Sequence, residues 1–189
     1  MPAQSLTIYR TLVKPSSLWR ELPVLLTFNA LLALTSYISI TLPWSPVPIT
    51  GQTFGVLVVA MALGRVRGTG VVLAYLTQGA LGLPVFAGGK AGVGILLGPT
   101  GGYLIGFLVA AFVIGRLADI GWSKRYHLSL LAMIIGMAVI YICGLTQLAF
   151  FVSRDLLLSA GLYPFLPGAA FKLTLASVVL PSVWRLVRR

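Results

Sequence analysis

Long apolar runs, separated by short polar, proline-rich or glycine-rich connections, fill most of the chain. They cover residues 22–42, 51–64, 68–83, 99–117, 128–151 and 168–187. Four of these runs have about the 20 apolar residues that a membrane-spanning helix needs, and the second and third are shorter. The pattern therefore predicts an all-α polytopic membrane protein with six transmembrane helices. Two of these helices are short and are joined by a tight turn at residues 65–67.

The connections between the runs are of two kinds. Three are irregular, namely residues 43–50 with three prolines, residues 84–98 with many glycines, and residues 153–167 with two prolines. Irregular backbone near a membrane is tolerated only where protein or a water-filled cavity satisfies its hydrogen-bonding groups. Three such loops at one end of six helices therefore predict a pocket with a lid.

The basic residues are divided unevenly between alternate connections. One set holds eleven of the fourteen lysines and arginines: Arg10, Lys14, Arg20, Arg65, Arg67, Arg116, Lys124, Arg125, Arg185, Arg188 and Arg189. The other set has only Lys90, Arg154 and Lys172. The positive-inside rule therefore predicts that both termini are cytoplasmic and that the three irregular loops face outward. A five-span arrangement would move the two arginines of the tight turn to the outer set and lose this asymmetry.

The composition also predicts a membrane protein, and the charge distribution argues against a nucleic-acid-binding protein. The chain is 58% hydrophobic and 9% charged, which predicts a single integral membrane domain over residues 1–189 with the lipid bilayer as its solvent. The net charge of +11 does not predict nucleic-acid binding, because the basic residues are scattered at the ends of apolar runs. The basic segment at residues 1–20 can either lie along the membrane surface or form a frayed tail.

The residues that most enzymes and metal sites require are missing. His127 is the single histidine, and the three carboxylates are not paired at helical spacing. Residues 88–91 resemble part of a phosphate loop, but the loop's first glycine and the Ser or Thr that would bind magnesium are absent. The sequence therefore predicts no enzyme activity, no metal site, no cofactor and no ATPase of its own.

Small residues in two helices predict close packing. Gly98, Gly102 and Gly106 recur at every fourth position, which places them on one face of a helix and lets another backbone approach. Cys143 lies within an apolar run and has no Cys or His neighbours at metal-ligand spacing. Both features are typical of helix packing.

Lys172 is the residue that points most directly to a ligand. An ammonium about one turn inside the sixth helix is costly unless it snorkels to the interface, pairs with an anion or faces a polar cavity. Only one carboxylate, Asp155, falls on the outer side, so the ligand itself is a candidate anion. Lys90 is a candidate second cation. The neighbouring Gly88 and Gly89 can either offer backbone N–H groups to a ligand or serve only a sharp turn.

Polar and aromatic residues near the outer loops complete the predicted pocket. Gln52, Gln78, Tyr75 and Tyr103 offer donors and acceptors for a neutral polar group, although hydrogen bonds between helices would satisfy the amides equally well. Phe86 can cover the apolar body of a ligand. These residues and Lys172 together predict a site for a small anionic solute.

Several stretches resemble one family of membrane transport proteins. They are Pro46-Val47-Pro48-Ile49-Thr50, Gln52-Thr53-Phe54, residues 82–89, residues 97–107 and, more weakly, residues 166–172. With these motifs the chain is similar to the BioY family, the biotin-specific substrate-binding (S) components of energy-coupling factor transporters. The resemblance implies a six-helix fold in the cytoplasmic membrane of a prokaryote, with biotin captured near the outer surface. It also implies two kinds of partner, a transmembrane coupling protein and ATP-binding-cassette ATPases.

The resemblance implies a set of pocket residues as well. They are Gln52, Tyr75, Gly88, Gly89, Lys90, Tyr103 and Lys172. We expect the biotin carboxylate to meet Lys172 and the ring system to lie beneath the glycine-rich loop. Family members often have an acidic residue directly after the Pro-Gly of the last helix, where this chain has Ala169, and Gln78 or Asp155 are candidate substitutes. The alternative function is a capture protein or carrier for another small anionic vitamin or acid.

Overall fold

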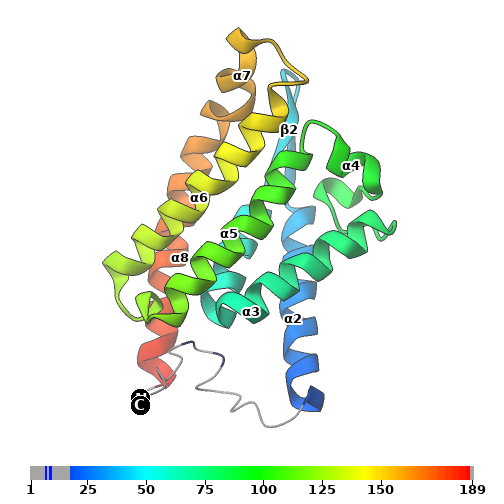
Figure 1. Ribbon diagram of the computed structural model, residues 1–189. Helices are drawn as coiled ribbons and strands as arrows, with labels where there is room; N and C mark the ends of the chain where they lie inside the picture. The colour runs from blue at the N-terminus through cyan, green and yellow to red at the C-terminus, as the bar shows by residue number, and fades with distance from the viewer. Residues whose placement is uncertain (1–6, 8, 10–17, 188–189) are drawn as a thin grey trace.

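The computed structural model describes residues 7, 9 and 18–187, and most of these residues are helical (Figure 1). In chain order, with η for a 3-10 helix, the elements are α2 (Leu18–Tyr37), β1 (Ser39–Leu42), β2 (Ser45–Thr50), α3 (Gln52–Ala80), η1 (Ala87–Gly89), α4 (Val93–Leu97), α5 (Gly101–Asp119), η2 (Trp122–Lys124), α6 (Tyr126–Leu148), α7 (Arg154–Gly161), η3 (Tyr163–Phe165) and α8 (Leu166–Val187). Most of the predicted basic segment at residues 1–20 lies outside the described residues.

Several helices have the length and composition to cross a membrane. In the part of the chain that the structure describes, four stretches do so: Gln52–Ala80, Gly101–Asp119, Tyr126–Leu148 and Arg154–Val179. The apolar part of α2, Glu21–Tyr37, is shorter. Large apolar side chains such as Leu34, Phe112 and Ile142 are exposed on the outer helix faces, which suits helices surrounded by lipid.

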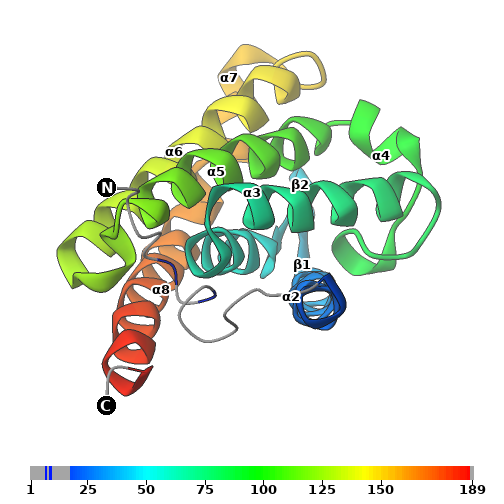
Figure 2. The same ribbon diagram turned by 60° about the horizontal axis from the view of Figure 1, so that its bottom comes forward.

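The two predicted short helices are the two arms of α3, but the break lies at a different residue from the one predicted. Gly64 has φ 80° and ψ −177°, which interrupts the helix, whereas the predicted turn at residues 65–67 is helical. A left-handed φ favours glycine because it has no Cβ. The Asp119 carboxylate accepts a hydrogen bond from the Arg65 N–H at 3.2 Å and so caps the second arm. Figure 2 shows the first arm nearly end-on and the second running across the view.

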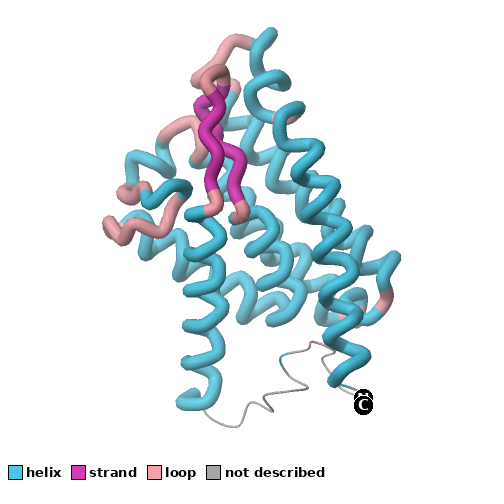
Figure 3. Tube along the Cα trace, turned by 180° about the vertical axis from the view of Figure 1, so that it is seen from behind, coloured by secondary structure: helices cyan, strands magenta, loops and turns pink. Residues whose placement is uncertain are grey.

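The end of the first helix differs from the prediction. That helix was expected to reach residue 42, but α2 ends at Tyr37 and the next residues form an antiparallel hairpin, β1 with β2 (Figure 3). Ser39 pairs with Thr50, and Ile40 pairs with Ile49. Prolines are tolerated in β2 because both strands of an isolated pair are edge strands. The fold is therefore mostly helical, with one small hairpin in the described chain.

The third irregular connection is also more regular than expected. Residues 153–167 were predicted to be a loop, but they contain α7 and η3, which the next helix follows directly. Ser153 has extended backbone angles and precedes α7, whose first turn contains Asp155, a favourable position for an acidic side chain. The connection therefore presents a short helix to the hairpin rather than an open loop.

The predicted glycine contact of the fourth helix is confirmed in part. A Cβ on Gly106 of α5 would lie 3.0 Å from the Cα of Ile140 in α6, and a Cβ on Gly102 would meet the carbonyl of Cys143. Both glycines therefore let α5 and α6 approach closely. Gly98 precedes α5 and does not take part in this contact.

The two ends of the molecule carry different elements. The first turn of α2, the break in α3 and the last turn of α8 lie at one end, and the hairpin tip and α7 lie at the other (Figure 1). A salt bridge of 2.8 Å between Glu21 and Arg67 joins α2 to the second arm of α3. The placement of Arg65 and Arg67 near the first turn of α2 supports the six-span topology over the five-span alternative.

Candidate functional site

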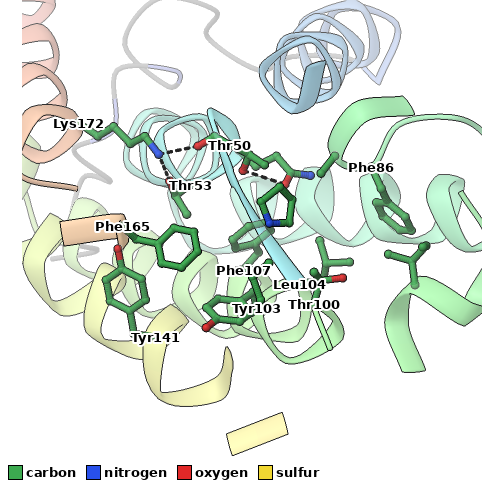
Figure 4. Close-up of a pocket in the computed structure, with 15 residues that line it drawn as sticks. Thr50, Thr53, Phe86, Thr100, Tyr103, Leu104, Phe107, Tyr141, Phe165 and Lys172 are labelled. Atoms are coloured by element: carbon green, nitrogen blue, oxygen red, sulfur yellow. Dashed lines mark hydrogen bonds between the residues drawn. The ribbon is translucent and has the colours of Figure 1, made fainter. Parts of the chain in front are cut away.

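A cavity lies between the hairpin, the first arm of α3, α5, α6 and the start of α8 (Figure 4). It contains about 590 Å³ of space free of protein atoms, counting its open mouth. Its lining consists of Val47, Pro48, Thr50, Gln52, Thr53, Phe86, Ala87, Ile95, Thr100, Tyr103, Leu104, Phe107, Tyr141, Phe165 and Lys172. Sites for small molecules typically have mainly apolar walls with a few polar groups, as this lining does.

Lys172 supplies the charge of this cavity. Its ammonium donates hydrogen bonds to the Thr50 carbonyl at 2.5 Å and to the Thr53 hydroxyl at 3.0 Å. Both acceptors are neutral, and an ammonium has three N–H groups to donate. One donor therefore remains beyond these two bonds. In Figure 4 the side chain reaches from α8 towards the junction of the hairpin and α3.

The three carboxylates of the chain lie away from this ammonium. Glu21 pairs with Arg67, and Asp119 caps the second arm of α3. Asp155 is exposed in the first turn of α7. Within the described residues, no carboxylate forms an ion pair with Lys172, as the sequence suggested.

Gln52 and Tyr75 form a buried hydrogen-bonded chain. The Gln52 side chain accepts a hydrogen bond from the Thr50 hydroxyl at 3.0 Å and donates one to the Tyr75 hydroxyl. Tyr75 in turn donates to the Val85 carbonyl at 2.7 Å. Gln52 lines the cavity, whereas Tyr75 is fully buried behind it and is not part of the lining. The structure therefore places Tyr75 where it positions Gln52 and the loop at Val85.

The glycine-rich loop contributes its first residues to the cavity. Phe86 is buried, meets the Tyr75 ring edge-on at 5.8 Å, and covers Gly79 so closely that a Cβ there would overlap the ring. Phe86 and Ala87 line the cavity. The left-handed backbone at Gly88 and Gly89 turns the chain back on itself, and a hydrogen bond of 2.9 Å from Gly89 N–H to the Phe86 carbonyl closes the turn.

Two other predicted residues lie outside the cavity lining. Lys90 is exposed at the end of the glycine turn. Gln78 borders a second, apolar groove between α2 and the second arm of α3. Ala169 is buried in the hydrophobic core one turn before Lys172. Of the predicted residues, the cavity lining thus brings together Gln52, Phe86, Tyr103 and Lys172.

Tyr103 contributes to the cavity wall and also contacts the end of α7. Its ring packs on Gly144 of α6, where a Cβ would overlap it, and its hydroxyl donates to the Gly161 carbonyl at 2.7 Å. The Ser45 hydroxyl donates to the adjacent Ala160 carbonyl at 2.7 Å. The last carbonyls of α7 are therefore held by α5 and by the hairpin.

Sequence reasoning did not select several lining residues. The polar ones are Thr50, Thr53, Thr100 and Tyr141, and Phe107 and Phe165 add aromatic surface. Thr50 and Thr53 belong to the stretches that carried the family resemblance. Tyr141 gave a weaker signal, a phenol inside an apolar run, and only the packing of α6 shows that it lines the cavity.

These features define a polytopic membrane protein with a cavity that has mainly apolar walls and one half-buried ammonium. The chain belongs to the BioY family, whose model matches residues 9–189. The family consists of substrate-binding components of transporters, so the chain is a transporter component rather than an enzyme. The resemblance in the motifs is thereby confirmed.

Named relatives and a solved structure agree with this membership. A biotin transporter BioY from Thermotoga maritima is 42% identical over 154 residues, which cover 80% of this chain and 88% of that protein. A biotin transporter BioY from Rhizobium etli is 36% identical over 169 residues, or 85% and 90% of the two chains. The crystal structure of the S-component for biotin from an ECF-type ABC transporter superposes with a TM-score of 0.78 at 29% identity, covering 90% and 92% of the chains.

Proposed function

We propose that this protein captures biotin at the outer face of the prokaryotic cytoplasmic membrane. A transmembrane coupling protein and ATP-binding-cassette ATPases then power its uptake. The observation that carries the proposal is the cavity at Lys172, in a chain whose relatives are named biotin transporters. The eleven basic residues predicted on the cytoplasmic side support an outward-facing cavity.

The chemistry of biotin suits the lining. Its fused ring system and alkyl tail need apolar surface, which Phe86, Tyr103, Phe107 and Phe165 provide. Its carboxylate and ureido groups need a few well-placed polar partners. Lys172 is the charged residue among the lining residues, and one of its three N–H groups is left over for a ligand oxygen.

We assign this remaining N–H to an oxygen of biotin, and the charge of Lys172 favours the carboxylate. A half-buried ammonium with neutral partners alone is costly, and an anionic ligand would offset that cost. A charge-assisted hydrogen bond contributes about 1.5–3 kcal/mol. We therefore expect Lys172→Ala to weaken biotin binding by about 10- to 150-fold, measured by titration of the purified protein.

The control variant is Arg154→Ala, because Arg154 is exposed and does not line the cavity. Its affinity for biotin should stay within about twofold of the wild type. Repeating the titration with the neutral amide of biotin identifies the oxygen. A Lys172→Ala penalty that is large for biotin and small for the amide assigns the carboxylate, and equal penalties assign the ureido oxygen. Unchanged affinity for both ligands would reject the contact altogether.

Two further experiments separate the parts of this proposal. Competition with a panel of anionic vitamins tests biotin against the alternative ligands, and displacement by another vitamin at lower concentration would reassign the substrate. Uptake into vesicles, with and without the coupling protein, the ATPases and ATP, tests the need for partners. We expect concentrative uptake only when all of them are present.

A further inference from the structure

Seven polar side chains line the cavity, and they differ in how much of their hydrogen-bonding capacity the protein already uses. They are Thr50, Gln52, Thr53, Thr100, Tyr103, Tyr141 and Lys172. A group already bonded within the protein fixes the shape of the site, whereas an unpaired group in an apolar cavity is costly until something bonds to it. Sorting the seven by their partners therefore separates the framework of the site from the groups left for a ligand.

Five of the seven are bonded inside the protein. Thr50 donates to Gln52, which donates to Tyr75, and Lys172 donates to Thr53 and to the Thr50 backbone. Tyr103 donates its one hydroxyl proton to Gly161 at 2.7 Å. The Tyr103 ring forms part of the cavity wall, but its hydroxyl proton is already used in the hydrogen bond to the last residue of α7.

The hydroxyls of Thr100 and Tyr141 form no hydrogen bond with any residue that the structure describes. Thr100 precedes α5 directly, and the first N–H groups of that helix include one, at Gly102, within local reach of a threonine hydroxyl at this position. The Tyr141 hydroxyl stands at the end of a rigid ring in the middle of α6 and has no such local alternative. Figure 4 shows this ring beside Phe165 at the cavity.

We propose that Tyr141 is a specificity-determining residue whose hydroxyl hydrogen-bonds the bound ligand, while Tyr103 is a positioning residue. This inference rests on the proposed function, since it assumes a ligand with polar groups in this cavity. It assigns different tasks to two tyrosines on neighbouring helices that both contribute to the lining. The sequence pattern had singled out only Tyr103.

The test compares Tyr141→Phe with Tyr103→Phe in the purified protein. Each substitution removes one oxygen and keeps the ring. Tyr141→Phe should leave the melting temperature of the ligand-free protein unchanged and weaken biotin binding by about 3- to 10-fold. Tyr103→Phe should lower the ligand-free melting temperature by about 2–4 °C, because it leaves the Gly161 carbonyl without its partner. Tyr163→Phe, at an exposed tyrosine outside the lining, should change neither quantity.

The outcomes separate this inference from the proposed function. Wild-type protein that fails to bind biotin overturns the proposed function and the inference that rests on it. If the wild type binds biotin and Tyr141→Phe binds it equally well, the inference alone is overturned. The inference would also be overturned if Tyr141→Phe lowered the ligand-free melting temperature as much as Tyr103→Phe does. Such a fall would mean that the Tyr141 hydroxyl already has a hydrogen-bond partner within the protein.

Discussion

The two ends of the molecule satisfy their polar groups in different ways. At the end where α2 begins, Glu21 pairs with Arg67 at 2.8 Å and Asp119 accepts a hydrogen bond from the Arg65 N–H. Both carboxylates are used inside the protein. They hold the broken helix α3 to its neighbours on either side.

At the cavity end, charge is not matched in this way. Among the described residues, the ammonium of Lys172 bonds to neutral oxygens alone and the hydroxyl of Tyr141 has no hydrogen-bond partner. Donors and acceptors therefore remain unused at this end. The comparison indicates that the carboxylates of the first end are used within the protein, whereas the ammonium at the second end keeps a donor for a ligand. Substitutions at the first end should change stability, and those at the second should change binding.

The largest expected effect is at the break in α3. A Cβ on Gly115 of α5 would lie 2.6 Å from the backbone nitrogen and Cα of Arg65, and backbone atoms cannot move aside as a flexible side chain can. We expect Gly115→Ala to destabilise the protein by about 3 kcal/mol, seen as a large fall in melting temperature. Gly70→Ala is the matched control, because its Cβ would meet nothing within 4 Å. Equal stability of the two variants would show that the break does not depend on this contact.

A smaller effect is expected at Asp119. Asp119→Ala removes the side chain that caps the second arm of α3, which should lower the free energy of unfolding by about 0.5–2 kcal/mol. Asp119→Asn keeps an oxygen acceptor and should recover part of this loss. Biotin affinity should be unchanged in both variants. If an Asp119 variant bound biotin more weakly at unchanged stability, the proposal that this end determines stability and the cavity end determines binding would be wrong.

The smallest effect is expected at Ser45, which contacts α7 from the hairpin. Ser45→Ala removes the bond to the Ala160 carbonyl and the bond of 3.0 Å that the hydroxyl accepts from the Val47 N–H, and so loosens the connection that carries Phe165 over the cavity. We expect biotin to dissociate about 3- to 10-fold faster, measured by chase with unlabelled biotin. Ser159→Ala is the control, because among the residues that the structure describes its hydroxyl bonds to the Leu156 carbonyl of the same helix alone. Equal dissociation rates in the two variants would show that the Ser45 hydroxyl does not help to retain biotin in the cavity.

The sequence predicted the order of the apolar helices well, because each apolar run reflects the thickness of the bilayer; four stretches are long enough to span it, and the two short helices are the arms of α3. It placed the break in α3 at the basic residues 65–67, whereas the left-handed turn is at Gly64, one residue earlier. It also missed the hairpin and α7. Residues 38–42 are apolar enough to continue a helix, and their strand conformation depends on pairing with residues 45–50.

The candidate site was predictable where a residue was chemically out of place. Lys172 stood out as a charge within an apolar run, and the structure places it in the cavity. Tyr75 was selected on the same grounds as Tyr103 but lies behind the lining, and Tyr141 was not selected at all. The rotation of each helix about its axis decides which tyrosine faces the cavity. That rotation is set by packing between helices, which an apolar run does not encode.

The most direct test of the central claim is an experimental structure of the protein with biotin bound. The account predicts density for biotin in the cavity between the hairpin, α5, α6 and α8. One of its oxygens should lie within about 3 Å of the Nζ of Lys172. Biotin bound elsewhere, for example in the apolar groove beside Gln78, would contradict the account.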